Sequence, residues 1–293
     1  MTTTAQIAPR ALPSRRTRRS LGGISARTAV TVALAAYAVV SFYPFLWMVS
    51  AAFKTNSEVV SGGHLIPHHP TLQTLSDTWN KLDFFEYFTN SLKVTVLTTV
   101  LVVVVYAAAS YAFAVLRFPG RRLFYRLFLA LLFVPGVVTL LPIVLLESRL
   151  DILGTHWGLV LPFVNGSAPL AVLMLTNAFN TVPIELREAA RMDGAGELRI
   201  FARIYLPLAL PALVTIALLT AIPTWNEYQL TRISLNDPHT YTLPIALQAM
   251  QSESVVQYNS LMAAALIMVV PVIILFLCAQ RYFVNGLMGA VKG

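Results

Sequence analysis

The chain has 293 residues, of which 57% are hydrophobic and only 12% are charged, and its mean hydropathy is +0.69. A soluble domain carries about 25% charged residues, so this composition excludes an ordinary soluble protein and indicates an integral membrane protein. The chain contains one cysteine, which excludes an intrachain disulfide.

In chain order, the first 27 residues are rich in Arg, Ser and Thr, and we expect them to form a disordered basic segment. Apolar runs follow, each near the roughly 20 residues that a helix needs to cross a bilayer. The six spans are expected at 28–53, 91–115, 122–147, 157–181, 206–229 and 260–283. Pro135-Gly136 and Pro142 interrupt the third of them, and Asn165-Gly166 with Pro169 interrupts the fourth. Residues 28–293 are therefore predicted to form one all-α transmembrane domain with six helices.

Lysine and arginine are distributed unevenly over the two sides of these spans. Of the 21 Lys and Arg residues, 16 fall on the side that holds both termini and the connections after the second and fourth spans. Positive residues mark the cytoplasmic side of a membrane protein, so we expect both termini in the cytoplasm. This asymmetry accounts for the net charge of +8. No basic face with interleaved aromatic residues points to a nucleic-acid partner, and the expected surroundings are membrane lipid.

The cytoplasmic segment 183–206 carries eight charged side chains within nineteen residues. A charge at the bilayer centre costs about 2.5–3.5 kcal/mol on insertion scales, so burying all eight unpaired would cost on the order of 20 kcal/mol. Pro183 suits the start of a helix, and Asp193-Gly194 is a turn signal. After the turn, apolar residues recur at helical spacing: Leu198, Phe201, Ala202 and Tyr205. We expect two short helices around a turn outside the hydrocarbon, and a partner that binds them.

Polar groups within and beside the fourth and fifth spans are candidates for a hydrated path. They are Asn165, Ser167, Thr224, Trp225, Asn226, Glu227 and Tyr228. The combination of Gly and Pro between Asn165 and Pro169 should loosen the helix, and broken backbone at membrane depth lines a cavity or is buried in protein. Such a path suits a hydroxyl-rich solute. Hydrogen bonding between helices and an interfacial aromatic belt are the alternative interpretations.

Ionisable groups are nearly absent from the centres of the spans, which argues against a carrier driven by protons or sodium ions. The sequence also has no G-x-x-x-x-G-K-[ST] phosphate loop, no nucleophile elbow and no H-E-x-x-H or paired-cysteine motif. The outer histidines His64, His68 and His69 have no cysteine or carboxylate that completes a metal site. We therefore expect no enzymatic activity, no metal and no bound cofactor. Any ATP, with its Mg, would be used by a separate subunit.

The run Glu188-Ala-Ala-Arg-Met-Asp-Gly194-Ala, followed by Phe201 and Leu206-Pro207, resembles the "EAA loop" of ABC importer permeases. In that family the loop is a coupling helix that docks into a cleft on the ATPase subunit. The resemblance implies these coupling residues: Glu188, Ala189, Ala190, Asp193, Gly194, Phe201, Leu206 and Pro207. Met192 departs from the family pattern, where Ile or Val is more usual.

The likeness extends from about Asn90 to Gly293. Ser110-Tyr-Ala-Phe-Ala, Trp157-Gly-Leu, Trp225-Asn-Glu-Tyr and the C-terminal Gly-Ala-Val-Lys292-Gly follow in the order of carbohydrate-importer permeases of the maltose type. The resemblance implies a type I ABC importer permease fold in a bacterial or archaeal cell membrane. It also implies a second, different permease, two ATPase subunits and an extracytoplasmic solute-binding protein as partners, with a tail that reaches the ATPase interface.

The sequence thus predicts a permease subunit that forms half of the path for a sugar or sugar-like solute. A permease for another solute, such as a peptide or an amino acid, is the first alternative. A non-transporting membrane scaffold is the second, although a scaffold has no need for polar interruptions in its spans.

Overall fold

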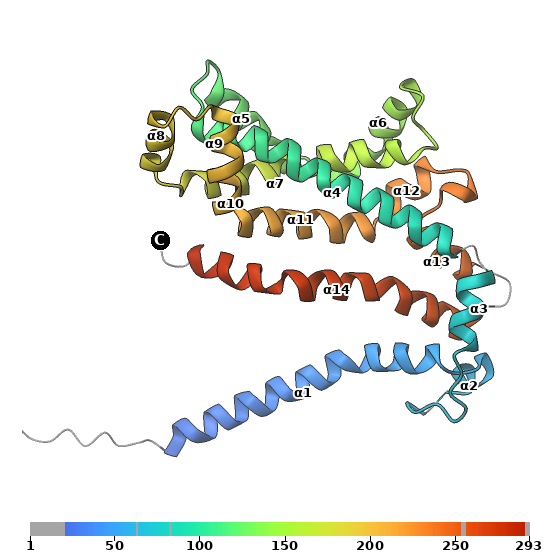
Figure 1. Ribbon diagram of the computed structural model, residues 1–293. Coiled ribbons are helices and arrows are strands. Elements are labelled where there is room, and N and C mark those ends of the chain that lie inside the picture. The colour runs from blue at the N-terminus through green and yellow to red at the C-terminus, as the bar shows by residue number, and fades with distance from the viewer. Residues whose placement is uncertain (1–20, 63, 82–83, 253–255, 291–293) are drawn as a thin grey trace, which may run out of the picture. The chain divides into compact units, whose positions relative to one another are not determined.

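The computed structural model describes residues 21–290, apart from residues 63, 82–83 and 253–255. Within these residues all regular secondary structure is helical (Figure 1). Most of the predicted basic segment 1–27, and the end of the C-terminal tail with Lys292, lie outside the described residues. Contacts divide the chain into two units, residues 1–47 and residues 48–293. The first unit holds most of helix α1 (Leu21–Ala52).

In the described part of the chain, four helices are long and apolar enough to cross a bilayer: α1, α4 (Phe84–Val115), α7 (His156–Asn180) and α14 (Tyr258–Ala290). Two bent pairs complete the predicted set of six. In the first pair, α5 (Arg121–Ala130) and η1 (Leu131–Phe133) meet α6 (Gly136–Arg149) at 107°. In the second pair, the helical stretch Glu197–Leu208 meets α11 (Leu210–Trp225) at 77°.

The expected interruptions have different outcomes in the third and fourth spans. The third span bends at Pro135, where the backbone is extended and α6 begins, as Pro-Gly predicts. The predicted interruption at Pro142 is wrong, because α6 continues through this residue. The fourth span is continuous, because α7 runs through Asn165, Gly166 and Pro169 without a break. The prediction of loosened backbone there is wrong. Ala168 and Pro169 are buried, and tertiary packing overrides the local preference of these residues.

Within residues 48–293, short helices lie at the two ends of the long helices α4 and α7 (Figure 1). At one end lie α5, α8 (Ile184–Met192) and α9 (Glu197–Ile200), followed by a π-helical turn η2 (Phe201–Tyr205) and α10 (Leu206–Leu208). At the other end lie α2 (Asn56–Ser61), α3 (Gln73–Lys81), α12 (Gln229–Ser234), η3 (Pro238–Thr240) and α13 (Leu243–Gln251). The amide of Asn90 at the start of α4 fixes this second end by donating to the carbonyls of His239, at 2.8 Å, and Tyr241, at 3.1 Å.

The largest hydrophobic core lies between α4, α7 and the helical stretch that leads into α11. α4 packs most extensively against α7 and next against α11. At the end of this core, Tyr111 of α4 and Phe179 of α7 meet Phe201 and Tyr205 of the π-helical turn. Such aromatic clusters contribute more than their buried area alone. The charged segment after α7 therefore rests on the largest hydrophobic core of the described residues.

Candidate functional site

The predicted pair of short helices around a turn is confirmed, and we call residues 183–200 the hairpin. α8 ends at Met192, and the chain reverses through Asp193 and Gly194 before α9. Gly194 has φ of +77°. Its N–H donates to the Arg191 carbonyl at 3.0 Å, and the Ala195 N–H donates to the Ala190 carbonyl at 2.9 Å. This is the Schellman arrangement, which requires a left-handed residue and so favours glycine.

The expected apolar stripe after the turn is only partly correct. Tyr205 is buried and Phe201 is half-buried, but Ala202 is exposed and Leu198 is 79% exposed. Ile200, which the stripe did not include, is instead buried. The reason is the π-helical turn from Phe201 to Tyr205, because an i→i+5 turn changes the angular register between the residues on either side of it.

The residues expected to couple to an ATPase divide into an exposed group and a packed group. Glu188, Ala189, Asp193, Gly194 and Pro207 are exposed, whereas Ala190, Phe201 and Leu206 pack against the core. Sequence reasoning missed two members of the exposed surface. Met192 is 88% exposed beside the turn, and Leu198 is exposed as well. The position of Met192 directly before the turn residues Asp193-Gly194 was the sequence feature that could have indicated its exposure.

A charged network joins the two helices of the hairpin to α4. One oxygen of the Glu197 carboxylate, Oε1, accepts from Arg187 Nη2 at 2.9 Å and from Arg191 Nε at 3.0 Å. The other oxygen, Oε2, accepts from the Tyr111 hydroxyl at 2.6 Å. Burial is the largest single influence on the Arg187 guanidinium and lowers its pKa, but the hydrogen bond to Glu197, the negative charge of Glu197 and the contact with Tyr111 together raise that pKa above its usual value. Arg187 is therefore charged at any physiological pH.

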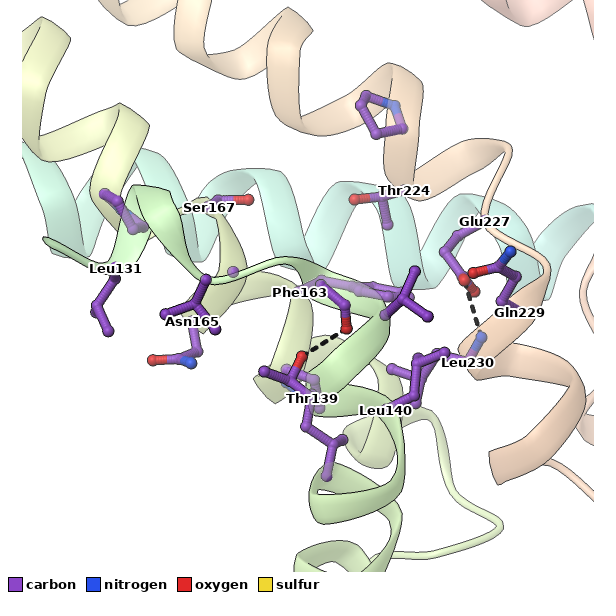
Figure 2. Close-up of a pocket in the computed structure, with 18 of the residues that line it drawn as sticks. Leu131, Thr139, Leu140, Phe163, Asn165, Ser167, Thr224, Glu227, Gln229 and Leu230 are labelled. Carbon is purple, nitrogen blue, oxygen red and sulfur yellow. Dashed lines mark hydrogen bonds between the residues drawn. The ribbon is translucent and has the colours of Figure 1, made fainter. Parts of the chain in front are cut away.

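A second feature is a hollow of about 740 Å³ between α6, α7, α11 and the start of α12. Figure 2 shows Asn165 and Ser167 on α7, Thr224 at the end of α11, and Glu227 just beyond it. Apolar residues such as Leu140 and Phe163 form most of the wall. Four of the seven candidates for a solute path thus lie on one hollow.

The other three candidates do not line this hollow, among the residues that the structure describes. Trp225 is 4% exposed, donates from Nε1 to the Met268 carbonyl at 3.1 Å and packs against Phe88 at 5.6 Å between ring centroids. It holds α11 against α14 and α4, so neither a solute contact nor an interfacial belt describes it. Asn226 is exposed and donates to the Ile222 carbonyl at 2.8 Å, and Tyr228 is half-buried.

Glu227 lines the hollow but is also committed to local structure. Its carboxylate accepts from the backbone N–H of Leu230 at 2.9 Å and of Thr231 at 3.1 Å, and from the Thr231 hydroxyl at 2.7 Å (Figure 2 draws the first). These groups belong to the first turn of α12, whose free N–H groups need acceptors. Glu227 therefore caps α12 and holds the start of that helix beside the hollow.

Comparison with known proteins places these features in a family. A family model described as a binding-protein-dependent transport system inner membrane component matches residues 102–288. The probable ABC transporter permease protein YurM of Bacillus subtilis is 35% identical over 267 residues, which are 91% of this chain and 89% of that protein. The trehalose transport system permease protein SugB of Mycobacterium tuberculosis is 34% identical over 253 residues, 85% and 92% of the two chains.

Among solved structures, a chain of a bacterial ABC transporter involved in import of the acidic polysaccharide alginate has a TM-score of 0.78 and 26% identity, and the match covers 90% of this chain and 98% of that one. The helical spans of the structure and these matches lead to the same family. The chain belongs to the inner membrane component family of binding-protein-dependent transport systems, as a multi-pass ABC transporter permease subunit and not as an enzyme.

Proposed function

We propose that this chain forms half of the translocation path for a neutral sugar or short oligosaccharide in an ABC importer. The observation that carries the proposal is the cargo named for two of the similar proteins described above: trehalose for one and alginate for the other. Both are carbohydrates. The amide of Asn165 and the hydroxyls of Ser167 and Thr224 on the hollow support it, since such groups both donate and accept hydrogen bonds to sugar hydroxyls.

The charge of the hollow favours a neutral sugar over an acidic one. Among the described residues, its lining contains the carboxylate of Glu227 and no lysine, arginine or histidine. An acidic sugar would meet a like charge in surroundings of low polarity, without a cation that offsets the cost. On this half of the path, an uncharged carbohydrate therefore fits better than an alginate-like polymer.

The hairpin is proposed as the surface that docks on the ATPase subunit. Its exposed side presents Glu188, Ala189, Asp193 and Gly194, with the large apolar side chains Met192 and Leu198 beside them. Covering one such apolar side chain contributes about 1.5–3 kcal/mol. Charged side chains around them supply the polar rim that is usual at protein interfaces. The aromatic cluster beneath supports the hairpin from the membrane side.

The proposal also includes an orientation in the membrane and a set of partners. The hairpin and both termini lie in the cytoplasm of a bacterial or archaeal cell, in keeping with the distribution of Lys and Arg. The complete importer contains a second, different permease, two ATPase subunits that hold ATP and Mg, and an extracytoplasmic solute-binding protein. The helices α2, α3, α12 and α13 at the opposite end of the bundle then face the binding protein.

Reconstitution tests the proposal. Both permeases and the ATPase subunits are placed in liposomes, with the binding protein outside and ATP inside, and entry of labelled neutral oligosaccharides is measured. Uptake is expected only when ATP and the binding protein are both present. Uptake of labelled peptides or amino acids in place of sugars would refute the assignment of the cargo. Stable partner binding without any ATP-dependent uptake would make the chain a scaffold.

A further inference from the structure

We propose that Tyr111 and Glu197, with Arg187 and Arg191, form a joint that passes movement of the hairpin to the α4–α7 pair. The joint consists of these four residues, and they are positioning residues, since none of them lines the hollow. The inference rests on the proposed function, because it needs the ATPase to move the hairpin.

Each of the two backbone connections between the hairpin and its neighbouring long helices contains an irregular point. Towards α7, the residues from Thr181 to Pro183 separate the helices α7 and α8. Towards α11, the chain passes through the π-helical turn from Phe201 to Tyr205 and then bends by 77° at Ala209. Helices bend at such irregular points more readily than along a regular stretch. A displacement of α8 is therefore transmitted poorly along the chain, and side-chain contacts become the stiffer route.

The Glu197 carboxylate provides this lateral route, because its two oxygens serve two different bodies. Oε1 accepts from Arg187 and Arg191, which both belong to α8. Oε2 accepts from the Tyr111 hydroxyl of α4 at 2.6 Å. Hydrogen bonds to an ionised group are stronger and shorter than neutral ones. The rigid carboxylate thus ties α8 to a membrane-spanning helix that is distant in sequence.

The surroundings of Tyr111 fix its orientation. Its side chain is 5% exposed and packs against Phe201 and Tyr205, both at 5.0 Å between ring centroids, and against Phe179 at 6.3 Å. The hydroxyl is therefore presented to Glu197 by a ring that has little freedom to turn. Because Phe179 belongs to α7, a pull on Tyr111 acts on α4 and α7 together.

The helix α7 completes the route to the solute path. It carries Asn165 and Ser167 on one side of the hollow, and α11 carries Thr224 on the other. Since α4 packs most extensively against α7, a shift of the pair as one body changes the width of the hollow. Rigid-body movement of packed helices is the usual way in which a small displacement at one site alters another.

The test uses the complete reconstituted transporter and counts sugar molecules imported per ATP hydrolysed. Tyr111→Phe removes the hydroxyl and keeps the buried ring, and Glu197→Gln removes the charge and keeps the shape. Each is expected to lower the ratio by about threefold or more, because a charge-assisted hydrogen bond is lost. Binding of the ATPase to the permease pair is expected to stay within about twofold of wild type, because neither Tyr111 nor Glu197 is among the exposed docking residues.

Tyr106→Phe is the matched control, because Tyr106 is also buried in α4 but lies more than one helical turn from Tyr111. It should leave the ratio unchanged. The double variant should lower the ratio no further than the stronger single variant, since both break one contact. If Glu197→Gln fails to fold, Tyr111→Phe decides alone.

If both single variants import as many sugar molecules per ATP as the wild type, the proposed joint is refuted and the proposed function is unaffected. Strictly additive losses in the double variant would also overturn it. Failure of the wild-type protein to couple uptake to hydrolysis would refute the proposed function, and the joint with it.

Discussion

Replacement of Gly194 by alanine is expected to weaken docking of the ATPase through backbone strain alone. Gly194 has φ of +77°, and a Cβ built there meets no atom within 4 Å, so steric crowding does not enter. A residue other than glycine costs about 1–2 kcal/mol in the left-handed conformation. If that energy opens the turn in the undocked state, the apparent affinity falls with the population of the docking conformation, by up to about thirtyfold. Asparagine should fall between glycine and alanine, since its short side chain tolerates this conformation.

Gly196→Ala is the control for this prediction, because Gly196 stands two positions further along the same hairpin with φ of −72° and no atom within 4 Å of its built Cβ. Alanine fits that conformation without strain. The dissociation constant for the ATPase is measured by interferometry on the permease pair in nanodiscs, and only the variants at 194 should raise it. Equal constants for Gly194→Ala and Gly196→Ala would refute the reasoning from backbone conformation.

Three further predictions concern the docking surface, a close helix contact and the hollow. Leu198→Asp should weaken ATPase binding about tenfold or more, because Leu198 is 79% exposed and burying such a side chain at an interface contributes about 1.5–3 kcal/mol. The thermal midpoint of the permease should not change. Unchanged ATPase binding would show that Leu198 is not part of the interface. Gly158→Ala should lower the stability of the permease by about 1–3 kcal/mol, since its Cβ would lie 2.9 Å from the Ile152 carbonyl oxygen. Gly166→Ala in the same helix meets nothing within 4 Å and should be neutral or stabilising by up to about 1 kcal/mol; thermal unfolding that ranks the two variants the other way would contradict the packing described. Glu227→Ala should lower the stability of the permease by about 0.5–2 kcal/mol, because the cap of α12 is lost. Glu227→Gln keeps an acceptor and should retain most of the sugar uptake. Loss of uptake in the glutamine variant at unchanged stability would show that the carboxylate acts on the solute.

The hairpin could be predicted from the sequence because its signals are local. A cluster of charges excludes the hydrocarbon on energetic grounds alone, and Asp193-Gly194 specifies the turn through the backbone freedom of glycine. The bend of the third span at Pro135 is local in the same way. For these features the preference of a few residues and the final structure agree.

The errors arose where packing decides between local options. Pro169 removes a hydrogen-bond donor from α7, yet the helix continues because Pro169 and Ala168 are buried in the core. The spacing predicts that Leu198 shares one apolar stripe with Phe201 and Tyr205, because periodicity assumes a uniform helix. A π-helical turn, which separates Leu198 from this stripe, is not visible in such a pattern.

The hollow was foreseen only in part for the same reason. A polar or aromatic residue at the end of a span can face a solute, a neighbouring helix or the interface, and composition does not distinguish these cases. In the folded chain Thr224 lines the hollow, whereas Trp225 packs between α11 and α14. The joint between Tyr111 and Glu197 connects residues far apart in the chain, and no local pattern indicates it.

Disulfide crosslinking during transport tests whether an ATPase subunit binds the hairpin of this permease. The native Cys278, which is exposed, is first replaced by serine, and Met192→Cys then places one thiol at the hairpin tip. Single cysteines are scanned over the docking cleft of the ATPase, in liposomes that import a labelled oligosaccharide. We predict that the cysteine at position 192 forms a disulfide with the ATPase and that the crosslink stops uptake, whereas Ser252→Cys, at the opposite end of the bundle, forms none. A transporter that imports sugar while position 192 never crosslinks to the ATPase would contradict the account.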